Sequence, residues 1–212
     1  MDTIDRNISF DVTTLEELSA IYREPKEAVL TKQTDFITAP GRALIEASPF
    51  IIMATATEDG IDCSPKGDFP GFIKILDERT LLVPDRPGNN RIDGMKNLIA
   101  NPKIGLIFMV PGAEETYRVN GSARISTDPD LMARCEANGK PPRVVIVVTV
   151  EEAFNHCPKA FVRAKLWQAG MQGRPDGIPT NGTFAAYRDH GDADYAAKYD
   201  TDYAQRIPNE LY

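Results

Sequence analysis

The sequence has few of the side chains that bind metals or form disulfides. Its 212 residues include two histidines and three cysteines, and no two cysteines form a Cys-x-x-Cys pair. A structural zinc site needs four such ligands close together and would use nearly all that this chain has. An odd number of widely spaced cysteines also argues against a disulfide framework and is typical of a reducing compartment. We therefore expect no metal centre and a cytoplasmic protein.

Positive charge and long apolar runs are scarce as well. The formal net charge is -7 at pH 7, whereas a nucleic-acid surface needs clustered positive charge. No run approaches the roughly 18 apolar residues of a membrane span, and the first residues lack the basic and apolar blocks of a signal peptide. The sequence thus predicts no nucleic-acid partner and no membrane, and any anion must be bound by a few local cations.

The common nucleotide and hydrolase motifs are also missing. No Gly-x-Gly-x-x-Gly follows a strand, and there is no Walker loop and no Gly-x-Ser-x-Gly elbow. His156 and Cys157 could be a base and a nucleophile, but adjacent residues rarely place both side chains in hydrogen-bond geometry. A buried Cys157 beside a packing or capping His156 is the commoner arrangement. The role of these two residues stays open.

What the sequence does contain is a helical start followed by closely spaced strands. Thr14-Leu15-Glu16-Glu17 is a capping box, and a second helical pattern begins near Asp35. Apolar and alternating runs then predict strands, most of them in pairs joined by tight turns, at residues 50–57, 61–64, 71–76, 80–83, 104–110, 116–125 and 143–150. A short helix is expected at residues 131–137.

This spacing indicates an antiparallel sheet that closes on itself, in the α+β class. A doubly wound parallel sheet would need a helix between most successive strands, and the connections at 57–61 and 76–80 are too short for one. We expect a helical segment over residues 1–48 packed on a barrel over 49–168. Residues 169–212 would form an extension that lies at a subunit interface or is partly flexible.

The loop between the strand ending at Val83 and the helix near residue 95 is the first candidate site. It places Asn89, Asn90 and Arg91 just before the helix start, where backbone N–H groups lack partners and the helix dipole favours an anion. The pattern predicts a phosphate site, although a helix start without a ligand is the alternative.

Two further features could take part in binding. Ser64-Pro65-Lys66-Gly67-Asp68 offers a hydroxyl, a point charge and a glycine that lets backbone approach a ligand, although such a string is also typical of a surface turn. Trp167 is the only tryptophan, and it either anchors a core or an interface or stacks on a ligand ring.

Together these strings resemble the pyridoxamine 5'-phosphate oxidase-like, FMN-binding split-barrel family, and most of all a bacterial branch of FMN-dependent enzymes. The resemblance covers about residues 30 to 168 and includes the strings at 118–121, 125–129 and 156–160. It implies a six-stranded split β-barrel of Greek-key connectivity with N-terminal and peripheral helices. It also implies a homodimer that binds two FMN molecules at the subunit interface.

The resemblance gives the candidate residues their roles. The FMN phosphate would be held by Asn89, Asn90 and Arg91, with Ser64, Pro65 and Lys66 from the neighbouring strand end. Val83, Pro84 and Asp85 would run beside the ribityl chain or ring edge, and Trp167 would approach from the partner subunit. Lys74 is a weaker candidate. The arginine-rich C-terminal segment with which pyridoxamine phosphate oxidases bind substrate has no counterpart here, so vitamin B6 oxidation is not expected.

The predicted function is therefore an FMN flavoprotein that transfers hydride or electrons between the flavin and a small-molecule substrate or reduced nicotinamide. The catalytic residues and the substrate are left open. The alternatives are a flavin carrier or sensor without turnover and a reductase that uses the deazaflavin F420, whose longer anionic tail calls for a more extended basic groove. Haem ranks last, because the chain has only two histidines.

Overall fold

The computed structural model describes residues 10–168 and 177–212, and the chain divides into two compact units, residues 1–33 and 34–212. The first unit contains the helices α1 (Leu15–Ile21) and α2 (Glu27–Leu30). The Thr14 side chain accepts a hydrogen bond from the Glu17 backbone, and the Glu17 carboxylate accepts one from the Thr14 N–H. This confirms the predicted capping box. No residue of α1 is buried.

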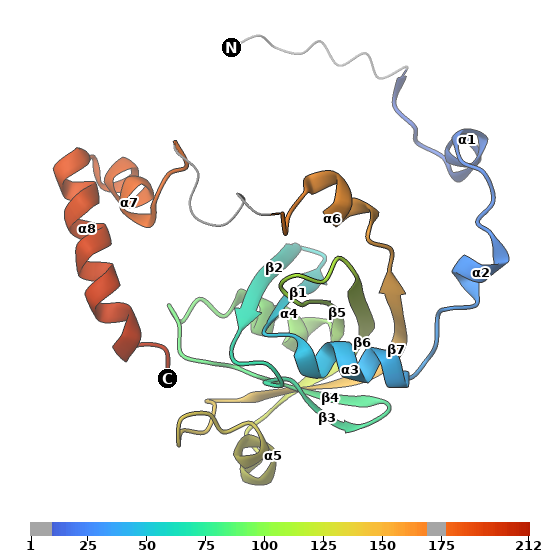
Figure 1. Ribbon diagram of the computed structural model, residues 1–212, viewed down its shortest axis with the longest axis horizontal. Helices are drawn as coiled ribbons and strands as arrows, with labels where there is room; N and C mark the ends of the chain where they lie inside the picture. The colour runs from blue at the N-terminus through green and yellow to red at the C-terminus, as the bar shows by residue number, and fades with distance from the viewer. Residues whose placement is uncertain (1–9, 169–176) are drawn as a thin grey trace. The chain divides into compact units, whose positions relative to one another are not determined.

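The second unit is built on one antiparallel sheet of seven strands in the order β2-β1-β5-β6-β7-β4-β3 (Figure 1). The strands are β1 (Phe50–Thr57), β2 (Gly60–Gly67), β3 (Lys74–Asp77), β4 (Thr80–Pro84), β5 (Lys103–Met109), β6 (Thr116–Ser126) and β7 (Val145–His156). The antiparallel α+β class is confirmed. The count of six strands that the family resemblance implied is wrong, whereas the seven strands predicted from the sequence pattern are all present, with β3 as an edge strand that pairs only with β4.

Two helices cover the inner face of the sheet. α4 (Asp93–Ala100) packs against β1, β2 and also β6, which is not a neighbour of β2 in the sheet. Such contacts require the sheet to curl around the helix, as Figure 1 shows. α3 (Ala39–Ala47) lies against β5, β6 and β7. It begins four residues later than Asp35, because Thr38 is its N-cap and Pro40 fits its first turn.

The core follows the alternation of the strands. In β1, Ile51 and Met53 are buried, while Phe50 and Ile52 face outward and are partly exposed. β4 differs, because Leu81, Leu82 and Val83 are all fully buried. A second small cluster covers the other face of β4 and β7 and consists of Leu82, Cys135, Val145 and Val147 with Leu131 and Met132 from α5 (Pro129–Arg134) and its surroundings. Burial on both faces explains the near-continuous apolar runs in these strands.

Element ends depart from the sequence prediction after residue 128. α5 ends at Arg134 instead of residue 137, and β7 continues to His156 instead of ending at Val150. The additional residues of β7 pair with β6 beyond a register shift between Asn120 and Gly121. Charged residues among them obscure the alternation that would otherwise predict a strand. The short helix α6 (Lys159–Ala164) follows.

The C-terminal segment contains two helices that the sequence reading missed, α7 (Asn181–Asp189) and α8 (Ala193–Arg206), and a last 3-10 turn at Ile207–Asn209. Both helices have local start signals, since Thr180 caps α7 in a capping box and Asp192 caps α8. Residues 169–176, where the extension was expected to begin, lie outside the described residues. No helix in the described parts of the chain is long and apolar enough to cross a membrane.

Candidate functional site

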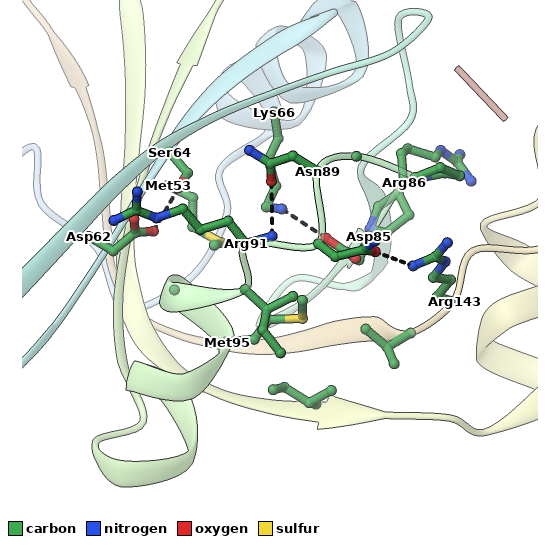
Figure 2. Close-up of a pocket in the computed structure, with 18 of the residues that line it drawn as sticks. Met53, Asp62, Ser64, Lys66, Asp85, Arg86, Asn89, Arg91, Met95 and Arg143 are labelled. Atoms are coloured by element: carbon green, nitrogen blue, oxygen red, sulfur yellow. Dashed lines mark hydrogen bonds and ion pairs between the residues drawn. The ribbon is translucent and has the colours of Figure 1, made fainter. Parts of the chain in front are cut away.

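A cavity of about 710 Å³ opens where β2, the end of β4, the loop after it and the start of α4 meet (Figure 2). Asp62, Ser64 and Lys66 line it from β2, because alternate residues of a strand share a face. These positions pair with Thr55, Met53 and Ile51 of β1, respectively, and so lie on the inner face of the sheet. The rest of the polar lining comes from residues 84–96 and 143–144.

The structure brings most of the predicted residues together in this one cavity. The predicted residues that line it are Ser64, Pro65, Lys66, Pro84, Asp85, Asn89, Asn90 and Arg91. Two others do not line it. Val83 is fully buried in the core. Trp167 donates its indole N–H to the Ala113 carbonyl at 2.7 Å and stacks on Phe161, so within its own chain it is tied to the connection between β5 and β6 and to α6.

Side chains fix the loop between β4 and α4. Lys66 Nζ lies 3.1 Å from Asp85 Oδ1, an ion pair in which both side chains are largely buried. Asn89 Oδ1 accepts from the Arg91 N–H at 2.9 Å. Asn90 has a φ of 60°, in the left-handed region that asparagine tolerates better than most residues. These contacts hold the loop that leads into α4.

The start of α4 faces the cavity and is open to a ligand. Among the residues that the structure describes, no side chain caps α4, so its first N–H groups lack the partner that a cap would provide. Gly94 allows the helix to approach β2 closely, since a Cβ there would lie 2.7 Å from Asp62 Oδ2. Arg91 is 80% exposed and donates to Asp93, and this hydrogen bond lowers the pKa of the Asp93 carboxyl.

Cations outnumber carboxylates in the cavity lining although the protein is acidic, while Asp68 and Asp93, just outside that lining, pair with Arg86, Arg91 and Lys96. Five cationic side chains and two carboxylates line it, namely Lys66, Arg86, Arg91, Lys96 and Arg143 against Asp62 and Asp85. In a chain with a net charge of -7, this local excess favours an anionic ligand. Sequence reasoning missed Arg86, Lys96 and Arg143 as site residues. The register Pro84↔Val145 brings Arg143 to the loop, and a sequence read without strand pairing carries no signal for it.

A buried ion pair also fixes the loop after β4. Arg86 Nε donates to Asp68 Oδ2 at 2.6 Å, and the Asp68 side chain is 2% exposed. The other Asp68 oxygen accepts from the Tyr212 hydroxyl, and the Arg86 guanidinium lies 5.8 Å from the Tyr212 ring centroid. Burial alone would raise the pKa of the Asp68 carboxyl, but hydrogen bonds from Tyr212, the Phe69 N–H and Arg86 outweigh it and lower the pKa.

Comparison with known proteins bears on the segment that builds this cavity. The family model described as pyridoxamine 5'-phosphate oxidase matches residues 37–157, which is more than half of the chain. The chain belongs to the pyridoxamine 5'-phosphate oxidase family. The matched segment contains all seven strands, β1 to β7, with α3, α4 and α5, and thus the cavity lining.

Solved structures of other proteins are similar to this family member at low identity. HupZ of Group A Streptococcus is 22% identical with a TM-score of 0.46, over 56% of this chain and 93% of that one. General stress protein 26 of Bacillus anthracis is 15% identical with a TM-score of 0.42, over 54% and 88%. An FMN-binding protein of Syntrophomonas wolfei is 12% identical with a TM-score of 0.41, over 55% and 88%. No curated protein matched.

The cysteines of this family member lie outside the cavity. Cys63, Cys135 and Cys157 are free thiols, and none of them lines the cavity. Cys157 is exposed, so the buried packing role expected for it is wrong, whereas Cys135 is buried and its burial raises the pKa of the thiol. Within residues 10–168 and 177–212, no group of three or more His, Cys, Asp or Glu residues could hold a metal ion.

Proposed function

We propose that this member of the pyridoxamine 5'-phosphate oxidase family binds FMN in the cavity and works as an oxidoreductase on a small molecule or reduced nicotinamide. One observation carries the proposal. The strand end at Ser64–Lys66, the strand end at Pro84–Asp85 and the helix start after Asn89–Arg91 line one cavity, although they are separate in sequence. The three free thiols support a reducing, cytoplasmic setting.

The residues present fit the parts of FMN. The uncapped start of α4, with Arg91 and Asn89, suits the phosphate, because N–H groups and a guanidinium donate hydrogen bonds to it. The Ser64 hydroxyl donates to Asp62 Oδ2 at 2.7 Å and would turn from it to the phosphate. Met53, Phe72 and Met95 supply apolar lining for a ring system. A volume of about 710 Å³ is also within the usual range of cofactor sites.

Bound FMN would supply the electron chemistry, and the protein would supply position and electrostatics. The Lys66–Asp85 pair is fixed at the cavity wall and would orient polar groups of the ligand. Apolar lining would exclude water from the ring. No general acid or base is required for hydride transfer to a flavin, so the proposal assigns no catalytic residue.

We also propose that the protein is a homodimer that uses the outer face of β1 and β5. Phe50 and Ile107 are each 36% exposed there, and Ile52 lies directly opposite Ile107 in the sheet. The next pair along this face, Ala54 and Gly105, is small, so another surface could approach closely. A face of apolar and small residues on a sheet is typical of a subunit interface.

The test begins with the cofactor itself. Protein purified from its native host is denatured, and the released compound is identified by absorption spectrum and mass. We expect FMN, and a colourless protein that also fails to take up added FMN would overturn the proposal. Release of F420 instead of FMN would identify the deazaflavin as the cofactor.

A second measurement separates an enzyme from a carrier. The FMN-loaded protein is mixed anaerobically with NADH or NADPH, and bleaching of the flavin absorption band is followed. We expect reduction by at least one donor at a rate above that of free FMN. A flavin that stays oxidised with either donor, and with a panel of small reductants, would identify a carrier or sensor.

A further inference from the structure

A carboxylate lies beside the start of α4 in the cavity. Asp62 lines the cavity from β2, and a Cβ on Gly94, the second residue of α4, would lie 2.7 Å from Asp62 Oδ2. Figure 2 shows the Arg91 side chain next to Asp62 and Ser64. Asp62 is thus close to the N–H groups and the guanidinium to which the proposed function assigns a phosphate. Its charge would repel a fully ionised phosphate bound there.

Asp62 differs from the other carboxylates around the cavity because, among the described residues, no ion pair includes it. Asp68, Asp85 and Asp93 each pair with a cation. The pKa of Arg91 is raised chiefly by its hydrogen bond to Asp93 and also by the charge of Asp62, so Arg91 and Asp62 lie within electrostatic reach of each other. The half-buried Asp62 carboxylate is therefore an acceptor without a neutralising partner.

Binding of a phosphate would remove the donor that Asp62 now has. The Ser64 hydroxyl donates to Asp62 Oδ2 at 2.7 Å, and it can bind the phosphate only if it turns away from that oxygen. A carboxylate cannot donate a hydrogen bond, so covering it with an anion that also only accepts leaves it unpaired. The ligand must then bring a donor to Asp62 in place of Ser64.

A phosphate monoester with one proton can bring that donor. Its P–OH group donates to the carboxylate, and its other oxygens accept from the N–H groups of α4 and from Arg91. The second pKa of a phosphate monoester is about 6, so the protonated form is available near neutral pH. A phosphodiester has no such proton at that pH.

We propose that Asp62 makes the phosphate site selective for an anion that has a P–OH group. The inference rests on the proposed function, which assigns the FMN phosphate to the start of α4, and it adds the choice among flavins. FMN is a monoester and can bring the proton, whereas the phosphodiester groups of FAD and F420 cannot. A site that requires a donor rejects ligands without one, because its own acceptor is then left unpaired.

Calorimetric titration of the FMN-free protein with inorganic phosphate and with sulfate at pH 8 tests the proposal. At that pH both anions are mainly tetrahedral dianions, and only phosphate has a proton to donate. We expect the wild type to prefer phosphate by about tenfold or more. Asp62→Asn should bind the two anions about equally, because an amide both accepts and donates hydrogen bonds. Thermal melting checks that each variant is folded.

Asp59→Asn is the matched control. Asp59 is exposed in the turn between β1 and β2 and lies outside the cavity lining. The control removes the same charge and should keep the wild-type preference for phosphate. Three results would overturn the inference: the wild type binds sulfate as tightly as phosphate, neither anion binds, or Asp62→Asn and Asp59→Asn have the same ratio of affinities.

A second titration, with FMN and FAD, tests the choice among flavins. The adenylate part of FAD is the same for wild type and variant, so a change in the ratio of the two affinities reports the donor requirement. We expect the wild-type preference for FMN over FAD to shrink about tenfold in Asp62→Asn. An unchanged flavin ratio beside a changed phosphate ratio would overturn the placement of the FMN phosphate at Asp62.

Failure of the proposed function is distinguishable from failure of this inference. If the protein takes up no flavin, the proposed function fails, while a preference for phosphate that Asp62→Asn removes still supports selection by Asp62. If FMN binds and both ratios are the same in wild type and Asp62→Asn, the proposed function stands and the inference is overturned.

Discussion

At the residue scale, the cations of the cavity differ in how deeply their ion pairs are buried. Lys66 and Arg86 each have a carboxylate within 3.1 Å, and both pairs are mostly buried. Arg91 is also paired, with Asp93, but its side chain is 80% exposed and can turn toward a ligand at little cost. We therefore expect buried pairs to stabilise the fold and exposed cations to set affinity.

The first prediction concerns Arg91. Arg91→Ala should weaken FMN binding by about tenfold or more, because a charge-assisted hydrogen bond to the phosphate is lost. Quenching of flavin fluorescence in a titration measures the dissociation constant. Arg163→Ala, outside the cavity, is the control. Equal FMN affinity in Arg91→Ala and the wild type would show that other residues hold the phosphate.

The second prediction concerns Asp68. Asp68→Asn should lower the free energy of unfolding at pH 7 by about 2 kcal/mol, because charged hydrogen bonds to Arg86 and Tyr212 are lost. Asp35→Asn is the control, since its ion pair with Arg79 is exposed and should contribute under about 1 kcal/mol. Urea denaturation of both variants gives the comparison, and equal losses would contradict the prediction.

The same carboxyl gives a pH dependence. The pKa of Asp68 is lowered in the folded protein, so its stabilisation is present above the unfolded pKa of about 3.9 and is lost as pH falls through the folded value. The stability difference between wild type and Asp68→Asn should therefore be constant near neutral pH and shrink below about pH 4. A difference that stays constant to pH 3 would exclude this linkage.

Local residues of the site could be predicted from sequence, and distant ones could not. Asn89, Asn90 and Arg91 are contiguous with the turn formers and the helix start that they serve, so one stretch of sequence contains the whole signal. Arg143 and Tyr212 reach the same loop only through strand register and the course of the C-terminal segment. Those contacts depend on tertiary structure, for which a single sequence has no local pattern.

At the element scale, the pairing of β6 with β7 depends on one glycine. The register shifts between Asn120 and Gly121, and a Cβ at Gly121 would lie 1.9 Å from the Thr149 carbonyl oxygen of β7. Backbone atoms in a central strand pair cannot move away as a flexible side chain can. The glycine is therefore required by the close approach of two strands.

Gly121→Ala should accordingly destabilise the protein by about 3 kcal/mol, as overpacking at a rigid position does. Gly60→Ala is the matched control, because nothing lies within 4 Å of a Cβ at that position and only the turn between β1 and β2 is affected. Both are measured by urea denaturation. Similar losses in the two variants would show that β7 can move aside.

Elements with a strong local pattern were predicted, and those whose pattern is mixed were not. The hairpin of β1 and β2 and the pair β3 and β4 follow from apolar runs joined by short turns. The end of β7 was missed because its last residues alternate with charged side chains, and α7 and α8 were missed because few of their residues are buried. Their caps, Thr180 and Asp192, were the available signal.

At the scale of the whole molecule, the sheet has one face in the core and another that bears exposed apolar residues. If the outer face of β1 and β5 forms the dimer, Ile107→Glu should produce a monomer, because a buried unpaired carboxylate costs several kcal/mol in each subunit. Sedimentation equilibrium gives the mass of wild type and variant. Val162→Glu, an exposed apolar position on α6 outside the sheet, is the control.

A wild-type protein that sediments as a monomer at all concentrations would contradict the dimer. A dimer that is unchanged by Ile107→Glu would place the interface on another face. If the protein is a monomer, the cavity of a single chain would have to bind the cofactor with the residues that line it.

The pairing of β4 with β7 also determines when the sheet and the cavity can be completed during translation. β4 ends at Pro84, but its neighbour in the sheet begins at Val145, so β4 has an open edge until β5, β6 and α5 have been synthesised. The pairing partner of Thr34 is synthesised later still, because Thr34 pairs with Ala153 in the second half of β7. The wall that contains Arg143 is completed by the same late strand. A nascent chain therefore cannot load its ligand until β7 has emerged, and the apolar edge of β4 is where a chaperone would be needed before then.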